Sequence, residues 1–168
     1  QDLLNEVNKD SVRFMMLNRS NDVELEFDFD KVKEKTKDNP VFYVQYAYAR
    51  INSIVRTLKK TLNDNISVSP NSFSPNQYEE KIIRKIFEWP KIIESAATKL
   101  EPHKIPFYLY ELSTLFHSYW SKGNEDNRFK FVENGKVKRE ESLIFIFLIA
   151  VVIKNGMNIL GVSLPEKM

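Results

Sequence analysis

The chain has 168 residues, 42% of them hydrophobic and 29% charged, which is typical of a folded domain and excludes a disordered or fibrous chain. This length suits one domain, or one domain with part of a second, and allows a sizeable buried core. Cysteine is absent, which excludes disulfides and thiolate metal sites and favours a reducing compartment, and the net charge of +2 neither indicates nor excludes a nucleic-acid partner.

The first part of the chain is predicted to be mainly helical, because it is free of glycine and its apolar residues recur at helical spacings. Short helices are expected at residues 2–7 and 10–17, each opening on an aspartate. Residues 25–30, LEFDFD, alternate in a strand-like pattern and lead into a lysine-rich segment. Pro40 is placed to begin the next helix.

The helix after Pro40 carries four aromatic residues and one arginine within residues 42–50. The residues expected on its core-facing side are Val44, Tyr48, Ile51, Val55 and Leu58. Those on a second side are Tyr43, Ala47, Arg50 and Ile54, with Tyr46 at its edge. A fully buried face would not hold an unpaired guanidinium. The second side is therefore either a core edge with a paired arginine, Glu111 being one candidate partner, or a stacking platform for single-stranded RNA.

In the second half, residues 63–77 are rich in Asn, Ser and Pro and are predicted to be a linker. A helix is expected over residues 78–100, with a kink at Pro90. Pro102 suits the first turn of a further helix that ends near Lys122.

A polar connector at residues 123–139 includes a brief extended segment predicted at residues 128–132. The last helix is predicted for residues 140–154, with Asn155 and Gly156 closing or bending it. Its apolar run is about half of what spans a bilayer, so a buried core helix is expected rather than a membrane segment. Together these elements predict an all-α bundle of about five main helices.

Side chains for catalysis or metal binding are sparse. His103 and His117 are far apart in sequence and have no metal-ligand spacing. There is no glycine-rich phosphate loop or nucleophile motif, and acidic neighbours such as Glu140 and Glu141 are typical of solvated charge. The residues alone predict a helical domain with no catalytic residue and no metal site.

The charges are unevenly distributed along the chain. Residues 1–30 have 8 acidic and 3 basic side chains, a net charge of −5, whereas residues 31–60 have 8 basic and 2 acidic side chains, a net charge of +6. Residues 102–139 have a net charge of +3. This pattern is explained either by two oppositely charged faces that pair or by a basic surface for phosphates.

Several stretches together resemble the C-terminal part of bacterial arginyl-tRNA synthetases. They are KDSVRFMMLNR (9–19), LEFDFDKVKEKTKDNPVFYVQYAYAR (25–50), EPHKIPFYLYELSTLFHSYW (101–120) and VIKNGMNILGVSLPEKM (152–168). They occur in the family's order, and the last ends as the family does, with a Leu-Gly turn, a Pro-Glu pair and a final methionine. Nearly the whole chain is covered, apart from residues 63–77 and 123–139.

The resemblance implies a helical bundle of the class I synthetase anticodon-binding type. It assigns residues 1–35 to the end of the catalytic half and residues 36–168 to a DALR-type anticodon-binding domain. The family's His-x-Gly-His and Lys-Met-Ser-Lys-like motifs are absent, and the chain starts at Gln1, so we expect a piece of a longer enzyme. The family attaches arginine to tRNA(Arg) with ATP and Mg, and this piece is expected to bind neither cofactor. A cytoplasmic monomer without a membrane or obligate protein partner is implied.

The resemblance also implies a binding site for the anticodon loop. Tyr46 matches a family tyrosine that packs against this loop, and Gln45 and Arg50 flank it. Trp120 matches an aromatic position that faces the same loop, and Met168 matches a terminal methionine near the anticodon. The expected tRNA-binding residues are Gln45, Tyr46, Arg50, Phe116, Trp120 and Met168.

The chain departs from the family's pattern in two places. Ser142 stands where many relatives have arginine, which places one phosphate or acidic partner in doubt. The bulkier Ile144-Phe145-Ile146-Phe147 replaces Leu-Ala-Leu-Val, which predicts a repacked core.

Two other functions remain open at this stage. One is a helical protein-interaction module whose aromatic residues bind a partner helix, and the other is the anticodon-binding domain of a different class I synthetase. Binding to tRNA separates the first from the family's function, and the residues upstream of Gln1 would separate the second.

Overall fold

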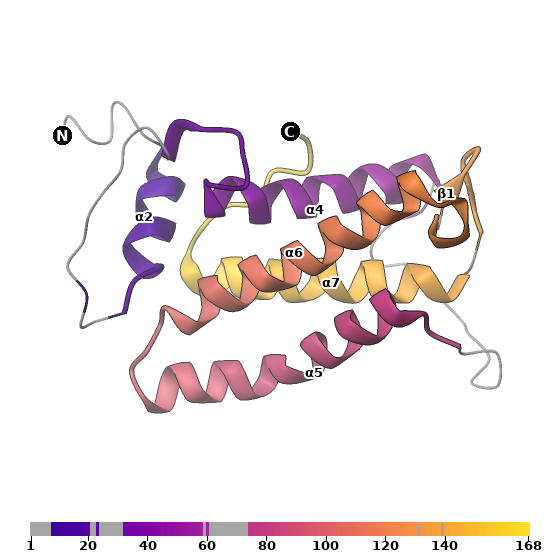
Figure 1. Cartoon of the computed structure of the whole chain (residues 1–168). Helices are drawn as coiled ribbons and strands as arrows, with labels where there is room; N and C mark the ends of the chain where they lie inside the picture. The colour runs from indigo at the N-terminus through magenta and orange to yellow at the C-terminus, as the bar shows by residue number, and fades with distance from the viewer. Residues whose placement is uncertain are drawn as a thin grey trace.

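The computed structural model describes residues 8–20, 23, 32–58, 60, 74–130, 132–138 and 140–168. The α-helices of this part are α2 (Lys9–Leu17), α4 (Pro40–Thr57), α5 (Gln77–Thr98), α6 (Lys104–Glu125) and α7 (Glu140–Leu160). They confirm the predicted all-α bundle (Figure 1). Helices α6 and α7 each pack against both α4 and α5, and α2 packs across one end of the bundle against α4 and α7.

The start of α4 follows from its local sequence. Asn39 is the N-cap and its side-chain oxygen accepts from the backbone N–H of Phe42 at 3.3 Å, while Pro40 occupies the first turn as predicted. The side-chain amide of Asn39 also donates to the carbonyl of Val32 at 2.7 Å and to that of Glu34 at 2.9 Å. This buried asparagine therefore fixes both the helix start and the segment that precedes it.

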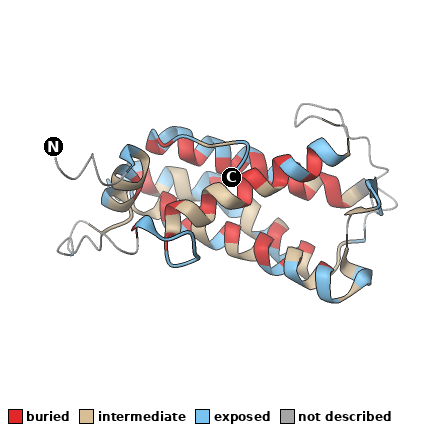
Figure 2. Ribbon diagram, turned by 90° about the horizontal axis from the view of Figure 1, so that it is seen from above, coloured by how far each residue is buried: buried red, intermediate tan, exposed pale blue. Residues whose placement is uncertain are grey.

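The core lies along the inner sides of the long helices. On α4, four of the five residues predicted to face the core are buried, and the fifth, Leu58, packs partly buried against it. On the second side, Ala47 and Ile54 are also buried, whereas Tyr43, Tyr46 and Arg50 are only half-buried. Figure 2 shows buried residues along the packed helices.

Helix α7 is longer than predicted. It continues through Asn155 and Gly156 and ends at Leu160. The next residue, Gly161, has a positive φ of 65°. A Cβ on Gly156 would lie 2.8 Å from both terminal methyl carbons of Leu109 on α6. The glycine at 156 thus permits a close approach of two helices, and the predicted end at this point is wrong.

By length and composition α7 is the one helix of the described residues that could cross a membrane, over Glu141–Leu160. In the bundle 61% of its most apolar window is buried. It therefore packs as a core helix, as the length of its apolar run predicted.

We expect Gly156→Ala to lower the free energy of unfolding by about 1–3 kcal/mol, the usual effect of overpacking. Leu109 is fully buried and has little room to move away from the added methyl group. Urea unfolding measures the change, with Val151→Ala on the exposed side of α7 as the control. In a helix without such a neighbour, glycine to alanine stabilises by about 0.5–1 kcal/mol. A variant more stable than the wild type would contradict this account of the packing.

Helix α5 begins one residue earlier than predicted, at Gln77, and ends at Thr98. It runs through Pro90 without a break, and its axis changes direction part-way along in Figure 1, as the proline predicted. Helix α6 starts two residues after Pro102 and ends at Glu125, so it is shifted toward the C-terminus of its predicted range.

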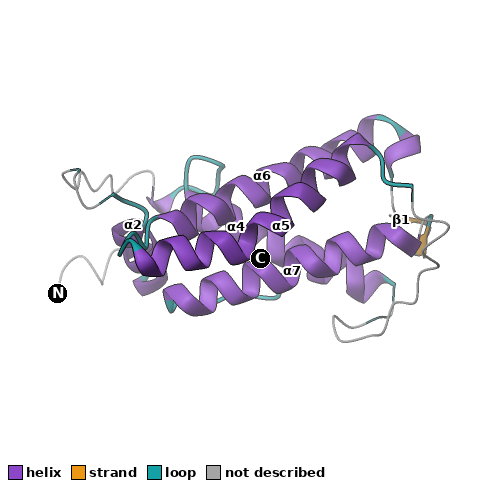
Figure 3. Cartoon of the chain, turned by 90° about the horizontal axis from the view of Figure 1, so that it is seen from below, coloured by secondary structure: helices purple, strands orange, loops and turns teal. Residues whose placement is uncertain are grey.

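Helix α2 begins at Lys9, and Asn8 is its cap rather than Asp10. The connector after α6 forms a 3-10 helix at Asn127–Phe129 and an antiparallel pair of β1 (Val132–Glu133) with β2 (Lys136–Val137). The extended segment predicted for residues 128–132 is therefore wrong in its first part. Figure 3 shows this hairpin at the end of the bundle opposite α2.

Three predictions fall outside the described residues: the helix at residues 2–7, the strand-like residues 25–30, and most of the linker, of which only residues 74–77 are described.

Candidate nucleic-acid interface

A cleft of about 650 Å³ lies beside α4 at the side where the C-terminal tail returns. The residues of its wall that bear on function are Tyr46, Arg50, Arg56, Trp120, Lys167 and Met168. Four of the six residues expected to contact tRNA, from α4, α6 and the tail, thus meet in one cleft. Three cationic side chains share it, so it combines aromatic rings with positive charge.

Arg50 lines this cleft and lies close to two of its aromatic rings. Its guanidinium carbon is 4.4 Å from the ring centroid of Tyr46 and 5.4 Å from that of Trp120, which are cation–π distances. Its Nη2 donates to the Tyr46 hydroxyl at 2.6 Å, and its Nη1 is 3.1 Å from Nδ1 of His117. Glu111, the candidate acidic partner, instead pairs with Lys85 of α5, so that expectation is wrong.

Tyr46 belongs to a row of rings on α4 and α6. Its ring stacks on Phe42 at a centroid distance of 5.7 Å and on His117 at 5.6 Å. The hydroxyl accepts from Arg50, so ring and hydroxyl both have partners inside the protein. Tyr46 and Trp120 are both half-buried, and both line the cleft.

His117 is the residue of this cluster that sequence reasoning did not place. It is 7% exposed, and its Nε2 lies 3.3 Å from the carbonyl oxygen of Tyr43. Burial lowers the pKa of His117 to about 4, with the nearby Arg50 charge adding to the decrease. Sequence spacing gives no signal for its contact with Arg50, since the two residues are 67 positions apart.

The C-terminal tail is fastened along α4 and α2. Gln45 donates from its side-chain amide to the carbonyl of Ser163 at 2.9 Å, and the N–H of Ser163 donates to the Asp10 carboxylate at 3.1 Å. Nearer the end, Arg56 donates to the carbonyl of Glu166 at 3.1 Å. These contacts bring Met168, which is half-exposed, to the cleft. Gln45 thus holds the tail and is not among the residues that line the cleft.

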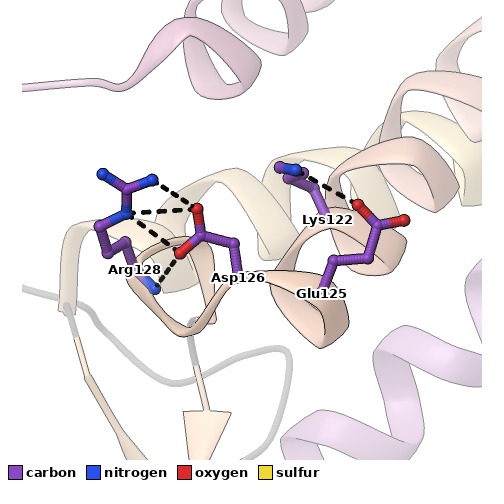
Figure 4. A network of polar contacts seen from close by, with 4 residues as sticks. All are labelled: Lys122, Glu125, Asp126 and Arg128. Atoms are coloured by element: carbon purple, nitrogen blue, oxygen red, sulfur yellow. Dashed lines mark hydrogen bonds and ion pairs between the residues drawn. The ribbon is translucent and has the colours of Figure 1, made fainter.

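Local ion pairs lie in the last turn of α6 and in the connector that follows it. Asp126 caps the 3-10 helix and pairs with Arg128, whose Nη2 is 2.7 Å from a carboxylate oxygen, and Lys122 pairs with Glu125 (Figure 4). The Arg128 guanidinium lowers the pKa of the Asp126 carboxyl to about 2. Val132 of the following hairpin closes one side of the cleft.

Over the described residues, no group of three or more His, Cys, Asp or Glu side chains is arranged to hold a metal ion. The chemistry available in the cleft is therefore that of aromatic rings, guanidinium and ammonium groups. Such a set stacks on bases and binds phosphates.

A family model of the DALR anticodon binding domain matches residues 44–168. The chain belongs to this family. It is 52% identical, over all of its residues, to an arginine–tRNA ligase of Pelagibacter ubique (strain HTCC1062), and covers 29% of that protein. It is 42% identical over its whole length to an arginine–tRNA ligase of Rhizobium leguminosarum bv. trifolii and covers 30% of that one. The chain thus spans under a third of the length of these curated relatives.

Solved structures of arginyl-tRNA synthetases have the same fold. A putative enzyme from Campylobacter jejuni superposes with a TM-score of 0.84 at 26% identity, over 99% of this chain and 35% of that one. The Thermus thermophilus enzyme superposes with a TM-score of 0.72 at 22% identity, over 95% of this chain and 26% of that one, which shows the fold alone.

In this DALR domain Phe116 belongs to the core. Its side chain has no exposed surface, and it lies one turn from Leu112 on the buried side of α6. Trp120, one turn further on and still within α6, is half-buried and lines the cleft. A side chain without exposed surface has no area to offer to RNA, so Phe116 is removed from the candidate interface.

Ser142, the departure from the family's arginine, has an internal partner in this DALR domain. It is buried and donates to Glu79 at 3.0 Å, and Tyr119 donates to the same carboxylate oxygen at 2.9 Å. The backbone N–H of Asn76 donates to the other oxygen at 2.9 Å. Ser142 therefore helps to hold α5, α6 and α7 together around the fully buried carboxylate of Glu79, and it does not face the cleft.

We expect Trp120→Ala to weaken tRNA binding by about 1–3 kcal/mol, the stacking contribution of one base. The ring also packs against the core, so a small decrease in melting temperature is expected with it. Binding is measured by filter retention and stability by thermal unfolding. The control is Trp89→Phe, at the other tryptophan, which is buried on α5 against Tyr108 and should leave affinity unchanged. A large fall in melting temperature with unchanged affinity would show that the ring only closes the end of the bundle.

Proposed function

We propose that this DALR domain binds the anticodon loop of tRNA(Arg) and is the anticodon-binding part of an arginine–tRNA ligase. The observation that carries the proposal is the cleft in which Tyr46, Arg50, Trp120 and Met168 converge from three separate segments. The relatives named arginine–tRNA ligase support the choice of enzyme.

The chemistry of the cleft suits an unpaired loop of RNA. Bases of a single-stranded loop are free to stack on aromatic rings, and the half-buried ring of Trp120 offers such a surface. Arg50, Arg56 and Lys167 line the same cleft and suit the phosphates that accompany each base. Phosphate contacts of this kind supply affinity that falls as salt concentration rises.

The division of the chain is part of the proposal. Residues 1–35 would be the end of the catalytic half, and residues 36–168 the anticodon-binding domain, a boundary that lies shortly before the family match begins at residue 44. The whole enzyme would be a cytoplasmic monomer that uses ATP with Mg to attach arginine to tRNA(Arg). The chemical step would lie outside these residues.

Filter binding of the 168-residue chain to tRNA transcripts tests the proposal. Saturable binding with a preference for arginine tRNA over transcripts with other anticodons is expected. Equal affinity for all transcripts would favour a different class I synthetase or charge-driven binding alone. No saturable binding would overturn the proposal and favour a protein-interaction module.

A further inference from the structure

We infer that His117 is a positioning residue that fixes the guanidinium of Arg50 in the orientation needed to contact RNA, an inference that rests on the proposed function. His117 itself is almost fully buried and does not line the cleft. It would act only through Arg50, which does.

The partners of the ring determine its tautomer. Arginine has only donors, so the nitrogen facing Arg50, Nδ1, accepts the hydrogen bond at 3.1 Å. A carbonyl has only acceptors, so Nε2, 3.3 Å from the Tyr43 oxygen, carries the hydrogen. One donor and one acceptor describe a neutral imidazole. The lowered pKa of His117, caused by burial, agrees with this assignment at neutral pH.

The imidazole ring of His117 is held in place by three aromatic neighbours and a backbone contact. Its centroid lies 4.4 Å from that of Tyr43, 5.6 Å from that of Tyr46 and 5.6 Å from that of Phe116. With its Nε2 bonded to the backbone of α4, the imidazole has one orientation, and its lone pair on Nδ1 points to Arg50. The acceptor offered to Arg50 is therefore fixed before any ligand binds.

After its contacts with His117 and Tyr46, the guanidinium of Arg50 still has N–H groups that can donate to a ligand. A guanidinium has five N–H groups. The contacts to His117 and Tyr46 use one N–H on each terminal nitrogen, while the rings of Tyr46 and Trp120 set its plane. A planar donor held in this way can present its remaining N–H groups to a phosphate or a base edge.

Two substitutions separate the two hydrogen bonds of His117. In His117→Asn, the shorter amide reaches the position of Nδ1 and can still accept from Arg50. In His117→Gln, the longer amide reaches the position of Nε2 and can still donate to Tyr43, but Arg50 loses its acceptor. We expect the asparagine variant to bind arginine tRNA within about twofold of the wild type and the glutamine variant to lose about three- to tenfold, the range of one hydrogen bond.

A double-mutant cycle shows whether the effect passes through Arg50. With Arg50→Ala already present, His117→Gln should cause no further loss of tRNA affinity. Equal affinities of the asparagine and glutamine variants, or the same loss with and without Arg50, would overturn the inference. Should the glutamine variant fail to unfold cooperatively, His117→Phe, which keeps a planar ring beside Tyr43, replaces it with the same expected loss.

A readout without RNA separates this inference from the proposed function. In ¹⁵N NMR spectra of the free chain, the Nη hydrogens of Arg50 should exchange slowly with water in the wild type and in His117→Asn, and fast in His117→Gln. Identical spectra in all three would overturn the positioning role. A wild-type chain that binds no tRNA would overturn the proposed function, and the spectra would still decide whether His117 holds Arg50.

Discussion

Arg50→Ala is expected to weaken tRNA binding by about 1.5–3 kcal/mol, the range for hydrogen bonds that involve a charged group. It should also lower the slope of log affinity against log salt by about one, because one fewer counterion is released when the complex forms. The guanidinium lies in the cleft between Tyr46 and Trp120, where a phosphate would meet it.

The salt slope is the decisive readout for Arg50. Alanine also removes the hydrogen bonds to Tyr46 and His117, so some loss of stability is expected whichever role the residue has. Filter binding at several salt concentrations, beside thermal unfolding, separates the two effects. Arg84→Ala is the matched control, since it removes an equal charge from the exposed surface of α5, which does not line the cleft. An Arg50→Ala variant that melts much lower and keeps the original salt slope would contradict an RNA contact.

Two variants of Tyr46 separate the contribution of its ring to tRNA binding from that of its hydroxyl. Tyr46→Ala removes both the ring beside Arg50 and the acceptor of its hydrogen bond, and should cost roughly 1–3 kcal/mol of binding. Tyr46→Phe keeps the ring under Arg50 and removes only the acceptor of its Nη2 hydrogen bond, so a smaller loss is expected. Equal losses for the two variants would show that the hydroxyl, and not stacking, accounts for the effect.

Phe116→Ala is expected to lower the free energy of unfolding by about 3–5 kcal/mol, as for other large buried aromatic residues. The side chain is fully buried, so alanine leaves a cavity in the centre of the bundle. Urea unfolding measures this, and Phe107→Ala, on the same helix but 46% exposed, is the control with an expected change of about 0.5 kcal/mol or less. Unchanged stability with a clear loss of tRNA affinity would return Phe116 to the interface.

Much of the bundle could be predicted from sequence because its signals are local. Asn39 and Pro40 specify the start of α4, and the period of its apolar residues specifies its buried side. The predicted end of α7 is wrong because the signal that decides it is not local. Gly156 is a helix-ending residue by its type, and its role in the interior depends on Leu109, which is distant in sequence.

The candidate site shows the same division between local and distant signals. Helical spacing placed Tyr46 and Arg50 together, one turn apart on α4. It could not supply the partner of Arg50, because His117 comes from another helix, nor the tail contact of Gln45. Neighbouring turns of α6 also differ in burial, since Phe116 has no exposed surface and Trp120 is half-buried, and their shared helical spacing could not predict this difference.

The fluorescence of Trp120 tests the central claim, that the cleft beside α4 holds the anticodon loop. The chain has two tryptophans, so Trp89→Phe leaves Trp120 as the only one. Titration with arginine tRNA should quench its emission through base stacking, and the quenching should saturate, with its half-maximal point at the dissociation constant found by filter binding. An arginine tRNA transcript with an altered anticodon should quench less at the same concentration. If the tRNA binds by filter retention and the emission of Trp120 does not change, the loop does not occupy this cleft.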